Sequence, residues 1–332
     1  MSDATEQTEI PRFGAPAIAT RIFGWSILTV LAAFLINNVL VVWGGFPGVR
    51  GIGGETTGGA LMQLALYALA IGAAVFFVMR NQTQSLRWDA HLVHSFNIYL
   101  IRALFWSVFL VGVVDAWVAF MRAEELAGVW FGDAMGKNFA RASWLGTHVH
   151  VPLVIAGFVI ALFTRTLGFT WLALLIVAAE LLIVISRFVF SYEQALMGDL
   201  VRYWYAALFL FASAYTLYDE GHVRVDVLYA GLGRTTRGYL NAQGTILFGL
   251  STAWVIMIIA FNGPQSIVNA PIKNFEISQA GPFGMYIKYQ MAAFIGVFAI
   301  TMIVQFVSYF FEAVADKRDE PGHREPAEGS AH

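Results

Sequence analysis

The chain has 332 residues, of which 58% are hydrophobic and only 13% are charged, and its mean hydropathy is +0.65. A soluble globular domain carries about 25% charged residues, so this composition indicates an integral membrane protein. The net charge of -2 argues against a nucleic-acid partner, which requires a concentrated basic face. Since the sequence contains no cysteine, disulfides, thiolate metal sites and thiol nucleophiles are excluded together.

The N-terminal residues 1–21 are polar and include acids, which is unlike the basic start of a cleaved signal peptide. Beyond them, several apolar runs reach roughly 20 residues, the length that crosses about 30 Å of hydrocarbon. These runs are continuously apolar, whereas the strands of a membrane barrel alternate. We therefore predict an all-α integral membrane protein with about eight transmembrane helices and additional interfacial amphipathic helices.

The eight spans are expected in chain order as uninterrupted apolar segments. They are predicted at Ile22–Trp43, Gly59–Met79, Ile98–Met121, Thr147–Phe163, Phe169–Val189, Leu200–Tyr218, Leu240–Phe261 and Met285–Phe311. An even number of spans places both termini on one side of the membrane. The larger share of the 20 lysines and arginines then lies on the side of the termini, which favours a cytoplasmic location for both.

Three segments between or after the spans carry charge. Residues 122–146 and 219–238 mix charged with apolar side chains, which is typical of amphipathic helices at the membrane surface. Residues 315–332 are charged and contain proline and glycine, so we expect a disordered cytoplasmic tail there.

Four polar side chains are predicted inside the spans: Asn37, Asn38, Asp115 and Glu180. A carboxylate near the bilayer centre is unfavourable by several kcal/mol unless it is paired, protonated or buried against protein. Two interpretations of Glu180 are open. It can bind ions or protons in a transporter that acts alone, or it can form a helix–helix hydrogen bond, including one with a partner subunit. Interhelical hydrogen bonding is the expected role of the other three.

The histidines raise a second possibility, a haem-binding electron-transfer subunit. His91, His94, His148 and His150 are the candidate ligands. Bis-histidine haem requires two imidazoles that face each other within the spans, whereas these four are predicted at span ends or in loops, so an interfacial role is favoured. No phosphate-binding loop and no arrangement of a nucleophile with a base stands out. We predict no enzyme and no cofactor.

The second half of the chain contains an ordered set of motifs. A span ending in "ISRFVF" is followed by "DLVRY" at the start of the next span, then by "EGHVRVDVL" and by "FEISQAGPFGMY" before the last span. This order resembles the small membrane subunit, called DctQ-like, of tripartite ATP-independent periplasmic (TRAP) transporters. The resemblance covers about residues 170–314 and departs from the usual pattern at 192–199, where only Asp199 stands in place of paired acids.

The resemblance implies a small permease subunit that braces a large, elevator-type membrane subunit in the bacterial inner membrane. Transport would be driven by a sodium or proton gradient, and a periplasmic binding protein would deliver an organic acid. Partner and lipid contacts are expected at the residues of the matching motifs: Arg187, Asp199, Arg202, Tyr203, His222, Arg224 and Asp226. As a helix, the segment around the last three would place His222 and Asp226 on one face, and Val223 and Val227 on an apolar stripe.

The resemblance leaves the first half of the chain unexplained. We therefore expect four regions: a polar segment 1–21, an extra four-helix transmembrane region 22–168, a TRAP small-permease-like four-helix region 169–314, and the tail 315–332. The extra helices are interpreted as an extension that widens a static frame, because an elevator needs a scaffold that holds its position while another part slides.

Overall fold

The computed structural model describes residues 10–166, 168–193, 195–218, 229, 231–278 and 283–323. These residues form helices and connecting turns, and no strand occurs among them beyond an isolated bridge. Eight of the helices are long and apolar enough to cross a membrane, which confirms the predicted all-α membrane fold. These spans are Ile18–Val42, Thr57–Arg80, Leu86–Ala123, Ala142–Phe163, Phe169–Phe190, Ala195–Tyr218, Arg234–Ala260 and Lys288–Lys317.

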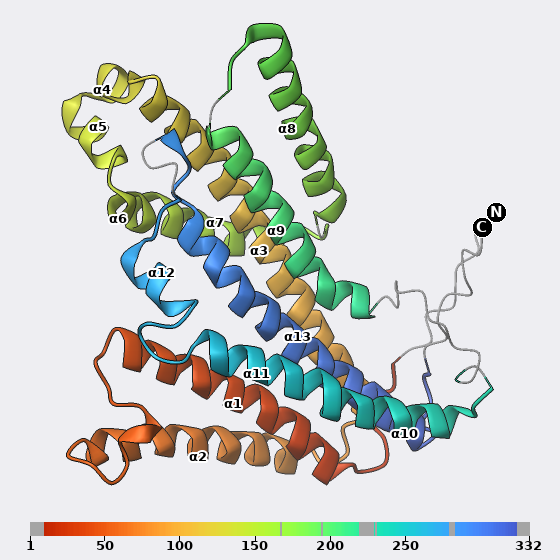
Figure 1. Ribbon diagram of the computed structural model, residues 1–332. Helices are drawn as coiled ribbons and strands as arrows, with labels where there is room; N and C mark the ends of the chain where they lie inside the picture. Colours follow the sequence, from red (N-terminus) through yellow and green to blue (C-terminus); the bar gives the residue numbers. More distant parts are fainter. Residues whose placement is uncertain are drawn as a thin grey trace, which may run out of the picture. The chain divides into compact units, whose positions relative to one another are not determined.

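In Figure 1 these spans correspond to α1, α2, α3, α6 with α7, α8, α9, α10 with α11, and α13. Two of them include a wider π-helical turn, at Gly146–His150 and at Thr245–Leu250. The remaining short helices are α4 (Leu126–Phe131), α5 (Asp133–Phe139) and α12 (Asn269–Asn274), together with a 3-10 turn at Val49–Gly51.

The chain divides into two compact units, and neither is a continuous segment. The first takes the residues up to Asn97, then Thr216–Val255, and the residues from Met302 onward. The second takes Ile98–Tyr215 and Ile256–Thr301. Each unit therefore combines helices of the predicted extension with helices of the motif-bearing half.

In the first unit, α1 and α2 pack as a helical hairpin and α3 begins beside them. The fully buried Arg21 of α1 donates from Nε to the Asp89 carboxylate of α3 at 2.6 Å, and its guanidinium also contacts the Asn81 carbonyl. Gln84 donates to the same carboxylate at 2.9 Å. A buried charge is tolerated only when it is paired and hydrogen-bonded, so these contacts allow α3 to start with polar residues.

This arrangement corrects the predicted start of the third span, because α3 begins at Leu86 and not at Ile98. The polar residues between them reduce the local hydropathy, and only their partners elsewhere in the fold make them buried. His91 and His94 therefore lie within a helix. His94 is buried, contacts Gln305 at 3.1 Å and stacks on Tyr218, while His91 is exposed.

A second ion-pair cluster surrounds Arg87, which is also fully buried. Its guanidinium contacts Glu312 and Asp316 on the last turns of α13, and it donates to the carbonyls of Glu320 and Pro321. These contacts correct the predicted tail. Helix α13 continues to Lys317, and the Glu320 and Pro321 carbonyls are held by Arg87, so a disordered tail cannot begin at residue 315. Residues 324–332 lie outside the described part of the chain.

In the second unit, α3 and α7 cross at small residues. A side chain on Gly157 of α7 would lie 2.5 Å from the backbone nitrogen of Ser107, and the Ser107 hydroxyl donates to the Val154 carbonyl at 3.1 Å. Close backbone approach at small residues and interhelical hydrogen bonds are the usual means by which helices associate in lipid. Glycine is therefore required at position 157 to keep α7 against α3.

Residues 122–146 do not form the single amphipathic helix that was predicted. They form α4, α5 and α6, because the backbone turns at Glu125 (φ 57°) and at Gly132 (φ 84°). The apolar residues of this segment partly fold back onto a small core. This core comprises Val118, Met121, Ala127, Phe139, Leu145 and Tyr286.

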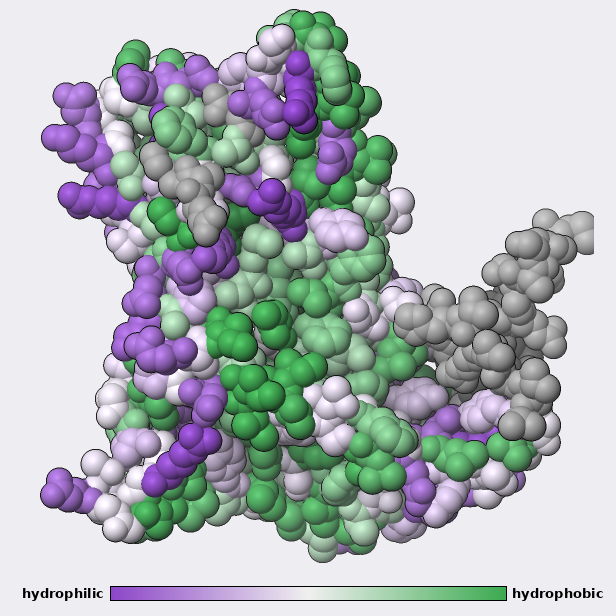
Figure 2. All heavy atoms as spheres, in the orientation of Figure 1, coloured by the Kyte–Doolittle hydropathy of each residue, from purple (hydrophilic) through white to green (hydrophobic). Residues whose placement is uncertain are grey.

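Among the spans, helix α8 has the smallest buried fraction. All of its residues are described, and only Leu172 near its start is buried. Phe169 packs edge-on against Phe105 of α3 at 4.7 Å between ring centroids, so the contact with the rest of the unit is concentrated at this end. Figure 2 shows hydrophobic side chains over much of the exposed surface of α8.

Candidate functional site

The second unit contains a buried polar cluster around Asp115, near the C-terminal end of α3. Its Oδ2 accepts a hydrogen bond from the backbone N–H of Tyr286 at 2.7 Å, and its Oδ1 lies 3.2 Å from His150 Nε2. The side chains of Asp115 and His150 are both fully buried. The carboxylate therefore has partners on both oxygens, as a buried carboxylate requires.

His150 connects this carboxylate to the start of α13. Its Nδ1 lies 2.8 Å from the Tyr289 hydroxyl, and the two rings are stacked. The Gln290 side-chain amide donates to the same hydroxyl at 3.1 Å. Its Oε1 accepts from the hydroxyl of the fully buried Tyr203 on α9. A continuous chain of hydrogen bonds thus joins α3, α7, α13 and α9.

A second carboxylate holds the neighbouring peptide group. Asp199 of α9 accepts a hydrogen bond from the backbone N–H of Met285 at 3.0 Å. Met285 directly precedes Tyr286, whose N–H donates to Asp115. Arg122 stacks on the Tyr286 ring at 3.8 Å and donates to the Gly284 carbonyl at 2.7 Å. The segment 284–286, which leads into α13, is therefore fixed on both sides.

The hydrogen bonds of this cluster hold helices and the segment 284–286 together. The carboxylates of the cluster are directed at backbone N–H groups and a histidine, and both oxygens of Asp115 have a partner within the protein. Asp115 and His150 come from the predicted extension, whereas Asp199, Tyr203, Tyr286 and the residues of α13 come from the motif-bearing half. The two halves thus share one buried network within this unit.

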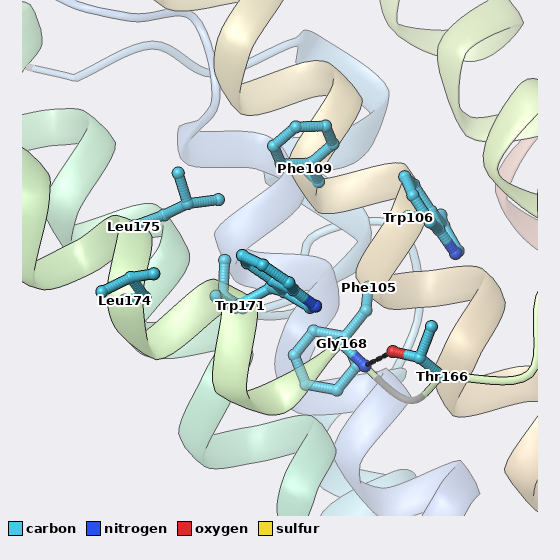
Figure 3. Close-up of a pocket in the computed structure, with 9 residues that line it drawn as sticks. Phe105, Trp106, Phe109, Thr166, Gly168, Trp171, Leu174 and Leu175 are labelled. Carbon is cyan, nitrogen blue, oxygen red and sulfur yellow. Dashed lines mark hydrogen bonds between the residues drawn. The ribbon is translucent and has the colours of Figure 1, made fainter.

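The second unit also contains a cavity of about 430 Å³ between α3 and the start of α8. Figure 3 shows Phe105, Trp106 and Phe109 from α3 on one side and Trp171, Leu174 and Leu175 from α8 on the other. Thr166 closes the edge, where its hydroxyl accepts from the Gly168 N–H at 3.1 Å. The lining lacks the charged or converging polar groups that a site for an organic anion would need.

The other predicted site residues are dispersed. Asn37 is buried and donates to the Gln63 carbonyl of α2 at 3.1 Å, and Asn38 is half-buried and has an interaction partner. Glu180 is exposed in the middle of α8. Arg187 forms an exposed ion pair with Glu193 at 3.5 Å, and the exposed Arg202 lies 3.8 Å from Asp199.

His222, Arg224 and Asp226 lie outside the described residues, so their predicted role as a surface brace stays a prediction. The expected position of two histidines needs correction, because His94 and His150 are buried and lie within helices rather than in loops. Both ring nitrogens of His150 already have partners, which leaves neither of them for an axial ligand. The described part of the chain contains no group of three or more metal-binding side chains.

Sequence reasoning identified Asp115, Asp199 and Tyr203 individually but not the cluster that they form. His150, Tyr289 and Gln290 were missed as members. One signal was present: a carboxylate in a span needs a donor at its own depth, and His150 lies at the edge of the neighbouring span. The backbone donors of Met285 and Tyr286 leave no trace in the sequence, because every residue except proline has an N–H.

The fold and this cluster define a multi-pass, all-α membrane protein whose polar residues hold helices together. Residues 173–314 match the family model described as tripartite ATP-independent periplasmic transporters, DctQ component. The resemblance seen in the motifs is thereby confirmed: this region is DctQ-like, and the preceding helices form an N-terminal extension. The family is one of transporter components and not of enzymes. Comparisons with curated proteins and with solved structures gave no match.

Proposed function

We propose that this chain is the small, scaffolding membrane subunit of a TRAP-type secondary transporter. The match of residues 173–314 to the DctQ component carries the proposal. The large membrane subunit would bind the substrate and the coupling ion and would move, while this chain remains static beside it. A periplasmic binding protein would deliver an organic acid, and a sodium or proton gradient would drive uptake across the bacterial inner membrane.

The buried cluster supports a static role. Asp115 and Asp199 are satisfied by backbone N–H groups and a histidine, and the cavity beside α8 is lined by aromatic and aliphatic side chains. A subunit that alternates between two shapes would need a discontinuous helix or a set of converging ligands near the bilayer centre. A subunit that braces another needs neither, but it does need helices that are firmly joined.

The proposal extends to the N-terminal helices. Three of the predicted regions, 1–21, 22–168 and 169–314, are kept in the proposal, without a separate disordered tail from residue 315. The second of them would enlarge the frame that faces the moving subunit. Because Asp115 and His150 hold the start of α13, deletion of residues 1–169 would also remove part of the packing of the DctQ-like region. Both termini are proposed to be cytoplasmic. The segment with His222, Arg224 and Asp226 is proposed to lie on the membrane surface against lipid or the large subunit.

Reconstitution tests the proposal. The chain is placed in liposomes with its large membrane subunit, a binding protein is added, and uptake of a labelled organic acid is measured under a sodium or a proton gradient. Uptake is expected only when both membrane subunits are present. Uptake by this chain alone would instead establish a transporter in its own right, and a Soret band in the purified chain would establish the haem-binding alternative.

A further inference from the structure

Glu180 presents an unusual electrostatic problem. It is the twelfth of the 22 residues of α8, so it lies about 15 Å from either end of the span at 1.5 Å per residue. Its side chain is exposed, and none of the described residues makes a hydrogen bond or an ion pair with it. A carboxylate at this depth against lipid is unfavourable by several kcal/mol, since hydrocarbon offers no donor.

Helix α8 packs on the second unit through its N-terminal part, and the face that carries Glu180 lies on the other side of the helix from that contact. At 100° per residue, Val177, Val184 and Arg187 share this face with Glu180. Trp171 and Leu175, which line the cavity against α3, lie on the opposite side of the helix. Val177, Val184 and Arg187 are all exposed, with exposed fractions of 64%, 48% and 62%.

We propose that this face of α8 docks a transmembrane helix of the large membrane subunit, and that this helix places a hydrogen-bond donor or a cation against Glu180. The inference rests on the proposed function for the identity of the partner. A lysine, arginine or histidine, or a serine or threonine hydroxyl, would supply the missing donor. The valines above and below Glu180 provide an apolar surface that excludes water and lipid from the contact.

A second copy of the chain fits this face poorly. Two copies in one membrane are related by an axis along the bilayer normal, so their α8 helices would run parallel and Glu180 would meet its own equivalent. Two ionised carboxylates at close range in a low dielectric oppose each other, so such a pair would require at least one of them to be protonated. Arg187 cannot compensate, because it is seven residues away, which is about 10 Å along the helix. A different chain with a donor at this depth satisfies the carboxylate.

Single-cysteine cross-linking tests the docking face, because the chain contains no cysteine and needs no preparatory substitutions. The probe is a benzophenone maleimide attached at Val177→Cys or Val184→Cys in membranes that contain both subunits. Leu182→Cys and Val189→Cys are the controls, since they lie on the opposite side of α8 and are at least as exposed, at 64% and 68%. Adducts with the large subunit are expected at the first two positions, several-fold above the controls.

Substitution of the carboxylate gives an independent readout. Glu180→Leu is expected to lower co-purification of the large subunit about tenfold or more, whereas Glu180→Gln, which keeps an acceptor oxygen, lowers it less. A leucine facing hydrocarbon is compatible with a span, and the free variant is checked as a monodisperse sample.

Three results would overturn the inference: adducts of two copies of this chain, equal adduct yields at all four positions, or undiminished co-purification of Glu180→Leu. If the wild-type chain itself fails to co-purify with a large TRAP subunit, then the proposed function is wrong, and not the docking face alone.

Discussion

Removal of the Asp115 carboxylate should destabilise the protein strongly. In the wild type the fully buried Asp115 carboxylate accepts from the Tyr286 N–H at 2.7 Å and lies 3.2 Å from His150 Nε2. In Asp115→Ala both of these groups lose their partner. A buried polar group left without its partner costs about 1–3 kcal/mol, so the loss should be about 2–6 kcal/mol. Even the lower value changes the ratio of folded to unfolded protein about 30-fold.

The effect can be measured by unfolding the purified chain in mixed micelles with increasing SDS, followed by the fluorescence of its 10 tryptophans. Asp115→Asn should lose only about 1 kcal/mol, because its amide oxygen still accepts from the Tyr286 N–H. Glu55→Ala, on an exposed turn, is the control and should stay within about 0.5 kcal/mol of the wild type. A wild-type transition for Asp115→Ala would refute the reasoning that this carboxylate fixes the start of α13.

Three further predictions concern packing and charge. Gly157→Ala should destabilise the chain by about 1–3 kcal/mol in the same assay, because its methyl group would lie 2.5 Å from the Ser107 nitrogen. Gly72→Ala, where the added methyl group meets open space, should be neutral or stabilising. Equal effects of the two would contradict the close crossing. Arg21→Met should lose about 3–5 kcal/mol by leaving the Asp89 carboxylate buried and unpaired, and the double variant with Asp89→Leu should recover much of it. Failure of the double variant to recover would show that the pair matters beyond its charge. For Glu320, burial raises the pKa above its ordinary value of 4.5, and Arg318 and Arg87 oppose this only in part. The folded state therefore binds the proton more tightly, so this contribution to stability is complete below pH 4.5 and is lost as pH rises through the raised pKa. Glu320→Gln should flatten that part of the stability profile, and an unchanged slope would rule the explanation out.

The spans could be predicted from the sequence because the bilayer imposes a local rule. Every backbone group of a span must be hydrogen-bonded within it, and about 20 consecutive apolar residues are needed to cross. Both requirements apply to a continuous segment, so Phe169–Phe190 was found almost to the residue. The start of α3 was missed because Arg87 and Asp89 are polar in sequence and become buried only through their partners.

The motifs also indicated the DctQ-like region, since they are short and ordered along the chain. The role of each polar residue, in contrast, was decided by tertiary structure. Asp115 and Glu180 are both single acids in apolar runs, and nothing local distinguishes them. In the fold, Asp115 faces a histidine and a backbone N–H, whereas Glu180 is exposed on the other side of α8 from its packing contact. Whether a carboxylate in a membrane is satisfied depends on donors contributed by distant segments, and only the packing of the helices brings those donors to it.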